Sequence, residues 1–268
     1  MSNMLKSERQ DEILSNVQRM KVAAIPELAE RLNVSEITVR RDLDELARAG
    51  LLERVRGGAR ERSQRGPEPP VIHRQMSQVE EKQAIGMAAL DLISDGDVIA
   101  VESGSTVFQL VKCISNRSWK QLQVVTNSFP IVEELIQVHG VQLVFIGGFV
   151  QPDELATFGV LAQDMLKNLR VNKLFIGCRG IDPQIGLMND LQAQLEVETV
   201  RAMAASAEQV IVLADHTKFG QHFMLLTLPI SSVDAIVADD QVPEAILEHL
   251  RKQDIQLVIV DTKTDEST

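Results

Sequence analysis

Near the N-terminus, apolar side chains recur at the three-to-four-residue spacing of an amphipathic helix, in two runs separated by a short turn. The second run places Val39, Leu43 and Leu46 on a single stripe. Ser35 suits the N-cap before this run, because a serine hydroxyl accepts a hydrogen bond from an amide of the first turn. Gly50 suits the position just after the C-terminal end of this second helix, because glycine adopts the left-handed conformation there without steric penalty. The pattern therefore predicts two helices with helix-turn-helix spacing.

The face of the second helix opposite the stripe is polar and charged. At about 100° per residue, Thr38 and Arg41 point away from the stripe, and Arg40 lies roughly 90° to its side. Arginine can pair with O6 and N7 of guanine, so Thr38 and Arg41 are candidates for contacts in a major groove, and Arg40 for a phosphate contact. Ser35 and Glu36, at the start of this helix, complete the candidate DNA-binding face. A charge run alone more often marks a solvated face, so this interpretation depends on its context.

The next residues supply that context. Residues 51–56 read as a strand that carries Arg54 and Arg56. The pair Gly57-Gly58 that follows predicts the turn of a β-hairpin. A hairpin with two arginines beside a recognition helix predicts a second contact with the phosphate backbone or the minor groove, made by Arg54, Arg56 and Gly57.

Residues 8–59 resemble the N-terminal winged helix of the DeoR family of bacterial transcriptional regulators. The stretches that carry the resemblance are Glu8-Arg9-Gln10 with Ile13-Leu14, Leu28-Ala29, the run from Val34 to Leu43, and Arg56-Gly57-Gly58-Ala59. The chain departs from the family at Ala24-Ile25, where a polar cap is commoner. The resemblance implies a DNA-binding domain that reads an operator.

The chain divides into two expected domains. Residues 1–59 form the winged helix, whose first helix is expected to open at Ser7 with Gln10 as its capping-box partner. Residues 60–76 hold three prolines, cannot form one regular element, and are expected to be the connection. Residues 77–261 form the second domain, and the polar residues 262–268 are expected to fray.

In the second domain, short and strongly apolar runs alternate with helical segments. Such runs are typical of parallel strands buried on both faces. The expected strands are 98–101, 122–125, 141–146, 173–176, 210–214, 235–237 and 256–260, and the helices between them include 131–138, 162–169, 193–207 and 243–251. The predicted fold class is α/β: a winged helix-turn-helix followed by a Rossmann-like open parallel sheet.

Small and polar residues follow five of these strands where each one ends. Ligands of open α/β sheets bind beyond the carboxyl ends of the strands, and hydroxyls and free amides at a helix start can hold a phosphate. Lys218 is the expected point charge for a phosphate; Asp215 either holds Lys218 in place or accepts from a sugar hydroxyl. The alternatives are simple N-caps and a local surface ion pair. The candidate effector-binding residues are Glu102, Ser103, Gly104, Ser105, Thr106, Thr126, Asn127, Ser128, Gly147, Gly148, Gly177, Gly180, Asp215 and Lys218.

Residues 79–239 also resemble the sensor domain of the DeoR family. The matching stretches are Gly104-Ser105-Thr106, Thr126-Asn127-Ser128, Gly147-Gly148, Phe175-Ile176-Gly177, Gly180-Ile181-Asp182, Gly186-Leu187, Glu198, Arg201-Ala202-Met203 and the run from Ala214 to Gly220. The resemblance implies a core similar to ribose-phosphate isomerase and CoA-transferase folds, and a phosphorylated sugar or related metabolite as effector. Glu102 stands where the family more often has Asp, Met188-Asn189 replaces threonines, and Val200 replaces a lysine. These departures allow a less charged or differently shaped effector.

The charge distribution agrees with DNA binding, although the whole chain of 268 residues carries a net charge of −11. Residues 1–66 hold 13 Lys and Arg against 11 Asp and Glu, a net of +2, and the remaining 202 residues hold 14 against 27, a net of −13. An acidic second domain suppresses indiscriminate binding to phosphates elsewhere on the protein.

Several classes of protein are disfavoured. There is no signal peptide pattern and no apolar run of 18 residues, so no membrane span is expected. Cys113 and Cys178 are isolated and are expected to be buried thiols in a reducing cytosol, which places the protein in the cytoplasm. No cysteine–histidine cluster has metal-ligand spacing, and neither a metal nor another cofactor is predicted.

The predicted function is a DNA-binding transcriptional regulator, a repressor of a carbohydrate-utilisation operon that a phosphorylated sugar releases from double-stranded operator DNA. Operators for such proteins are usually two-fold, so a homodimer or homotetramer is expected. One alternative is an isomerase-like enzyme acting on phosphosugars, which would need a positioned general base. Acids and histidines are present, but none lies in a catalytic pattern and no catalytic residue is predicted. The other alternative is an activator.

Overall fold

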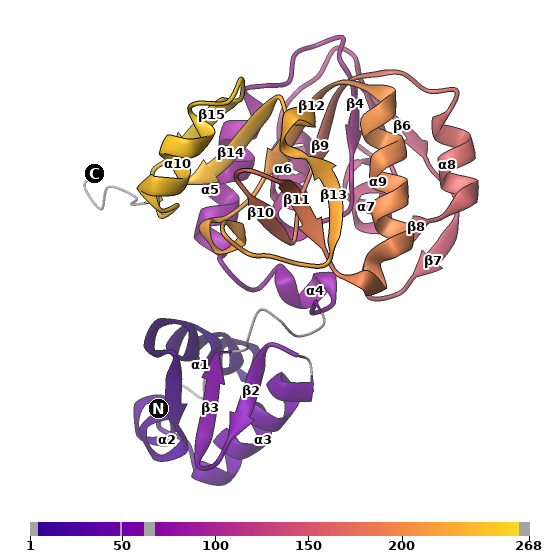
Figure 1. Ribbon diagram of the computed structural model, residues 1–268. Helices are drawn as coiled ribbons and strands as arrows, with labels where there is room; N and C mark the ends of the chain where they lie inside the picture. Colours follow the sequence, from indigo (N-terminus) through magenta and orange to yellow (C-terminus); the bar gives the residue numbers. More distant parts are fainter. Residues whose placement is uncertain (1–4, 49, 62–67, 263–268) are drawn as a thin grey trace, which may run out of the picture. The chain divides into compact units, whose positions relative to one another are not determined.

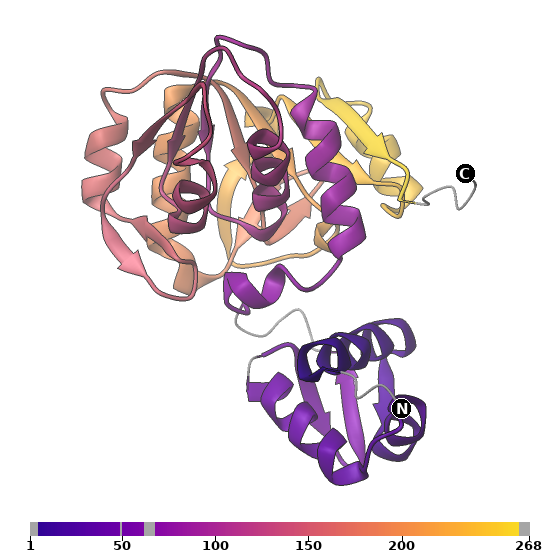
Figure 2. The same cartoon turned by 180° about the vertical axis from the view of Figure 1, so that it is seen from behind.

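The computed structural model describes residues 5–48, 50–61 and 68–262 and divides the chain into two compact units, Met1–Ser77 and Gln78–Thr268 (Figure 1). Figure 2 gives the opposite view of each unit. Residues 62–67 of the expected connection, and all but Thr262 of the expected polar tail, lie outside the described residues.

The first unit packs its first three helices against a small antiparallel sheet. Its elements are α1 (Lys6–Met20), β1 (Val22–Ala24), α2 (Ile25–Leu32), α3 (Glu36–Arg48), β2 (Leu52–Val55), β3 (Gly58–Glu61) and the short helix α4 (Val71–Arg74). The strand order is β1-β3-β2, so the hairpin of β2 and β3 forms the wing. The wing therefore extends two residues past the predicted end of the domain, and the expected connection contains a helical turn.

The predicted recognition helix forms as its sequence indicates. Val39 and Leu43 are fully buried and Leu46 nearly so, in a core shared with α1 and α2. The hydroxyl of Ser35 accepts a hydrogen bond from the Thr38 amide at 3.2 Å, which caps the first turn. Gly50 has a φ of 72°, the left-handed conformation expected after the end of α3.

The predicted start of the first helix was wrong. α1 begins at Lys6, and the Glu8 carboxylate accepts from the Leu5 amide at 3.0 Å. Ser7 thus lies inside the helix, because Glu8 is correctly spaced to reach back to the open amide of Leu5. Gln10 instead donates to Glu45 of α3 at 2.9 Å.

The second unit is built on one seven-stranded sheet. Its strands are β4 (Val98–Val101), β5 (Leu122–Thr126), β6 (Val141–Phe145), β9 (Val171–Ile176), β12 (Ala207–Leu213), β14 (Ala235–Asp239) and β15 (Gln256–Val260). Their order is β15-β14-β12-β9-β4-β5-β6, and every neighbouring pair is parallel. All seven predicted strands therefore form this sheet.

Helices cover both faces of the sheet. The helices are α5 (Val79–Leu90), α6 (Ser105–Ser115), α7 (Phe129–Leu135), α8 (Val160–Leu166), α9 (Gln194–Ser206) and α10 (Glu244–Leu250). Apolar side chains of α5, α6 and α7 share one core with the sheet, and those of α8, α9 and α10 share the other. Figure 1 shows α8 and α9 in front of the sheet, and Figure 2 shows the face that α5 and α6 cover.

Two small antiparallel sheets, which the sequence did not predict, extend the second unit. β7 (Phe149–Gln151) pairs with β8 (Ala156–Phe158), and β11 (Gly186–Asn189) pairs with both β10 (Gly180–Asp182) and β13 (Leu225–Pro229). Strands of three to five residues carry too few side chains for an alternating pattern to be recognised.

Cys113 and Cys178 are half-buried rather than buried, and no disulfide joins them. Cys113 borders a groove between α5 and α6, and its partial burial raises the pKa of its thiol.

In the described ranges, no helix combines the length and the apolar character that crossing a bilayer requires.

A buried ion pair fixes the orientation of α3. Asp42, on the core side of α3, is 1% exposed, and Arg9 of α1 contacts it through Nε at 2.5 Å and Nη2 at 3.2 Å. The pair therefore joins the recognition helix to α1.

We expect Asp42→Ala to lower the free energy of unfolding of the first unit by about 2–3 kcal/mol, because Arg9 would lose its carboxylate partner while remaining largely buried. Hydrogen exchange of the α1 and α3 amides in the full chain measures this. The control is Lys6→Ala, which removes a contact with Glu45 by a lysine that is 55% exposed, and should change little. Equal effects of the two substitutions would contradict the assigned role of Asp42.

Candidate DNA-binding and effector sites

The outer face of α3 presents the predicted DNA-binding side chains. The Arg41 side chain is 79% exposed and has one weak partner, Glu45 at 3.5 Å. Arg40 is 56% exposed and pairs with Glu36 at 3.1 Å. The Thr38 hydroxyl lies 2.9 Å from the Ser35 hydroxyl and belongs to the cap. Arg41 is thus the side chain of this face most available to a base edge.

The two wing arginines differ. Arg54 is 29% exposed, contacts Asp44 of α3 at 2.9 Å, and donates to the Gly58 carbonyl at 2.5 Å. It therefore braces the wing against α3. Arg56 and Gly57 are exposed at the turn, where Gly57 has a φ of 86°. The tip of the wing, rather than Arg54, is open to a phosphate.

In the second unit, the parallel strands bring their carboxyl ends to one edge of the sheet. Asp215 and Lys218 follow β12, Gly177 follows β9, and Glu102 follows β4, on adjacent strands. A Cβ placed on Gly104 or on Gly177 would lie 3.7 Å or 4.0 Å from the same atom of Val107. Two of the predicted loops therefore converge at the start of α6.

The loop after β4 is closely packed. Glu102 is 4% exposed, and Ser103 is 6% exposed and donates to its carboxylate at 2.8 Å. Gly104 is the N-cap residue of α6, and Ser105 and Thr106 lie in its first turn, each 7% exposed. The predicted anion site at this helix start thus consists of small and buried groups.

The residues after β5 hold the β7–β8 hairpin. Asn127 is fully buried; its Nδ2 donates to the Thr157 carbonyl and its own carbonyl accepts from the Thr157 amide, both at 3.0 Å. Thr126 accepts from the Ser128 amide at 3.2 Å. The Oδ1 atom of Asn127 has no partner among the described residues. These residues therefore have local structural roles, and Asn127 in addition keeps a buried acceptor without a partner in the described part of the chain.

The predicted glycines divide into two groups. A Cβ on Gly147 would meet nothing within 4 Å, so this backbone is open. A Cβ on Gly148 would lie 2.7 Å from the Phe158 carbonyl, and one on Gly180 would lie 2.5 Å from the Gln221 carbonyl. The last two positions require glycine because another backbone packs against them.

Asp215 is the most buried charged group predicted for the effector site, at 1% exposure. It accepts from the Thr217 amide at 3.0 Å and from the Thr217 hydroxyl. Burial favours its protonated form, but the charges of Lys218 and Lys82 and the bonds from Thr217 outweigh burial and lower the pKa of Asp215. Asp215 is therefore a buried carboxylate beside two cations.

Lys82 of α5 was missed by the sequence analysis. It is 2% exposed although it is a lysine. A signal was available, because Lys82 lies three residues before Ile85 and seven before Ala89, on the apolar face of its helix. A lysine on such a face indicates a buried acidic partner.

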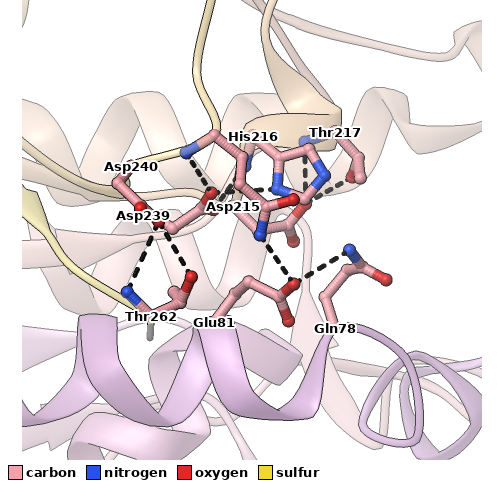
Figure 3. Close-up of polar contacts among 9 residues, drawn as sticks. Gln78, Glu81, Asp215, His216, Thr217, Asp239, Asp240 and Thr262 are labelled. Carbon is pink, nitrogen blue, oxygen red and sulfur yellow. Dashed lines mark hydrogen bonds and ion pairs between the residues drawn. The ribbon is translucent and has the colours of Figure 1, made fainter. Parts of the chain in front are cut away.

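A polar network joins the loops after β12 and β14 to α5 (Figure 3). The amide of His216 donates to Asp239 at 2.7 Å, and its ring Nδ1 lies 2.9 Å from the same carboxylate. The Gln241 amide donates to Asp239 at 3.0 Å, and its side chain donates to Glu81 at 3.1 Å. Glu81 also accepts from Gln78 at 3.4 Å. The first turn of α5 is thus fastened to the edge that carries Asp215.

The departures from the family pattern at residues 188, 189 and 200 have roles in local packing and hydrogen bonding. Met188 is 8% exposed within β11, and Asn189 donates to Glu196 at 2.8 Å. Val200 is 5% exposed and belongs to the core between α9 and the sheet.

Within the described ranges, no group of three or more metal-ligating side chains is close enough to hold a metal ion.

Two family models match the chain. The DeoR-like helix-turn-helix domain matches residues 9–65, and the DeoR C terminal sensor domain matches residues 77–240. The chain belongs to the DeoR family of transcriptional regulators. This confirms the resemblance inferred from the sequence and the predicted fold class.

Curated relatives of this DeoR-family protein match over nearly their whole length. The transcriptional repressor AccR of Agrobacterium fabrum (strain C58) is 32% identical over 92% of this chain and 95% of its own. The glycerol-3-phosphate regulon repressor of Escherichia coli (strain K12) is 29% identical over 95% of this chain and 99% of its own. These relatives are named as regulators, and the DeoR-family chain is a DNA-binding regulator rather than an enzyme.

The DeoR-family chain also has structural neighbours of low sequence identity. Ribose 5-phosphate isomerase A of Methanocaldococcus jannaschii covers 53% of this chain, which covers 55% of that protein, at a TM-score of 0.40 and 19% identity.

The His216–Asp239 pair predicts a pH dependence. The hydrogen bond with Asp239 raises the pKa of His216; burial opposes this, and the charges of Asp239, Asp215 and Glu81 add to it. In the unfolded state the pKa of His216 is about 6.5, and in the folded state it is higher. At pH values between these two, the folded state therefore binds more protons than the unfolded state. The contribution of His216 to stability is complete below that window and is lost as pH rises through it.

We expect the free energy of unfolding of the second unit to fall between about pH 6 and about pH 8, and to fall less in His216→Gln. Urea denaturation followed by far-UV circular dichroism measures both. An identical fall in the two proteins would show that His216 does not carry the linkage.

Proposed function

We propose that this DeoR-family regulator is a repressor of a carbohydrate-utilisation operon, which it binds as a homodimer or homotetramer and leaves when a phosphorylated sugar occupies the strand-end edge of its sensor unit. The observation that carries the proposal is the buried Asp215 carboxylate beside Lys218 and Lys82 at that edge. The glycerol-3-phosphate regulon repressor, named for a phosphorylated metabolite, and the repressor AccR support the class of function.

The DNA contacts follow from exposure and charge. Arg41 reads a base edge in the major groove because its guanidinium is exposed and can bond O6 and N7 of guanine together. Arg40 and Arg56 contact phosphates, which fix the register of α3 without reading sequence. Arg54 holds the wing at the correct angle to α3, and Ser35 and Thr38 fix the first turn that approaches the DNA.

The effector contacts follow from the order of strands along the edge. Lys218 supplies the charge for a phosphate, and the amides and hydroxyls of Ser105 and Thr106 at the start of α6 complete its binding. Between β12 and β5 lie β9 and β4, so the edge from Lys218 to Asn127 spans roughly 14 Å at three strand spacings. The sugar phosphate then lies along part of this edge, with its phosphate at Lys218 and its hydroxyls toward Glu102 and Asn127.

Release is a shift between two arrangements of the chain. An effector can move the equilibrium only by the difference in its affinity for the two arrangements. The segment between β3 and α5 is the connection through which the sensor domain acts on the DNA-binding domain. The network from Asp239 to Glu81 and Gln78 leads from the edge to the helix that begins directly after this connection.

We place this regulator in the cytoplasm, with its operator.

We expect Arg41→Ala to weaken operator binding by about 1–3 kcal/mol and to reduce the preference for operator over random DNA. Arg40→Ala is the matched control, because losing a phosphate contact weakens binding to both DNAs about equally and reduces the salt dependence. Fluorescence anisotropy with both DNAs at several salt concentrations separates the two effects. An unchanged preference in Arg41→Ala would refute base reading by Arg41.

We expect Lys218→Ala to keep normal operator binding and to lose release by effector, because the phosphate would lose its point charge. The test adds a panel of sugar phosphates, with glycerol 3-phosphate among them, to the protein–operator complex. Lys252→Ala, which removes an exposed lysine beyond α10, serves as the control for charge. Full release of the Lys218→Ala complex by a compound that also releases the wild-type complex would refute the phosphate assignment.

A further inference from the structure

Six large apolar side chains at one end of the sensor unit are strongly exposed. Their exposed fractions are 56% for Phe149, 58% for Val150, 56% for Val160, 55% for Leu161, 55% for Leu191 and 42% for Leu195. They lie on β7, on the first turn of α8, on the short helix η1 (Leu191–Ala193) and on the start of α9. We refer to these six residues as the end surface.

Four members of the end surface are grouped around Gly159. A Cβ placed on Gly159 would lie 2.9 Å from the Phe149 ring and 3.9 Å from Leu195 Cδ2, so these two side chains flank Gly159. Val160 and Leu161 follow Gly159 directly in the chain. Figure 1 shows β7, β8, α8 and α9 at the same end of the sensor unit.

The end surface is large for an apolar patch without a partner. Six side chains of this size, each about half exposed, present on the order of 500 Å², at the upper end of the largest apolar patch on a typical monomer. A standard protein–protein interface buries about 800 Å² on each partner. The end surface thus supplies most of the contact area that a stable dimer needs, with a polar rim to complete it.

We propose that the end surface is the interface between two copies of this chain, related by a two-fold axis. Residues 67–268 carry a net charge of −13 in each copy, so two sensor units repel each other across most of their surfaces. None of the six side chains of the end surface is charged, so their own contact adds nothing to this repulsion. A two-fold axis uses the same patch on both copies. The inference rests on the proposed function, since a two-fold operator requires a dimer.

The end surface is joined to the effector edge by the β7–β8 hairpin. Thr157 of β8 exchanges two hydrogen bonds with Asn127, and its hydroxyl donates to the Ile146 carbonyl. The Phe129 amide donates to the Leu155 carbonyl at 2.9 Å in the same hairpin. A ligand that moves Asn127 therefore also moves the strand that carries Phe149 and Val150. One segment then serves both the effector site and the subunit contact.

The test is the sedimentation velocity of the full chain carrying Leu161→Glu. In a two-fold interface each copy adds one buried carboxylate, and like charges in an interface cost several kcal/mol. We expect the dimer dissociation constant to rise at least about 100-fold, since each 1.4 kcal/mol is tenfold. Ile136→Glu is the matched control, because Ile136 is 62% exposed at the end of α7 and outside the end surface. It should sediment as the wild type does.

A second variant separates misfolding from dissociation. Val150→Glu places the charge on β7 instead of α8, and circular dichroism melts establish that each variant is folded. The proposal is overturned if the wild type is monomeric, if folded Leu161→Glu and Val150→Glu both keep the wild-type assembly, or if Ile136→Glu dissociates as readily. Operator binding by the wild type, measured separately by anisotropy, tests the proposed function and does not depend on the sedimentation result.

Discussion

The parallel direction of all seven strands in the main sheet is the constraint on which the sensor unit depends. Because every strand runs the same way, the loops after β4, β5, β6, β9, β12 and β14 meet at one edge. Burial on both faces explains why the strands at the centre of the sheet are largely apolar, and the polar candidates for the effector site lie at the strand ends and in the loops that follow them. Glu102, Asn127 and Asp215 then lie on one line although they are far apart in the sequence.

The buried carboxylate of Asp215 links that edge of the sheet to helix α5. Asp215 remains ionised inside the protein only with cations beside it, and one of them, Lys82, belongs to α5 rather than to the sheet edge. The His216–Asp239 pair and the Gln241–Glu81 contact fasten the same helix to neighbouring loops (Figure 3). Since α5 begins the sensor unit, a change of charge at Asp215 acts directly on the helix nearest in sequence to the DNA-binding domain. Toward the other end of the edge, Asn127 holds the β7–β8 hairpin. The proposed effector site therefore lies between helix α5 and this hairpin, and a bound ligand could shift either of them.

The main elements were predictable because their signals are local. The stripe of Val39, Leu43 and Leu46, the Ser35 cap and the apolar runs of the seven strands are each contained in a few consecutive residues. The short strands of the two small sheets were not predictable, because they form by pairing with distant segments rather than by their own pattern. The same reason applies to the site: Lys218 lies only three residues after Asp215, whereas the approach of Lys82 and the pairing of His216 with Asp239 depend on the order of β12 and β14. Ser7 was misassigned as a cap because Glu8, its neighbour, satisfies the open amide of Leu5, two residues before Ser7.

The proposed function requires that a phosphorylated metabolite binds at the strand-end edge of the sensor unit. Thermal unfolding of the full chain against sugar phosphates and their unphosphorylated parents tests it most directly, because a ligand that binds the folded state stabilises it by RT ln(1 + [L]/Kd). We expect at least one phosphorylated sugar to raise the melting temperature, while its parent at the same concentration does not. A rise with the parent alone, or with no compound in the panel, would contradict the assignment of the edge around Asp215 and Lys218 as a phosphate site.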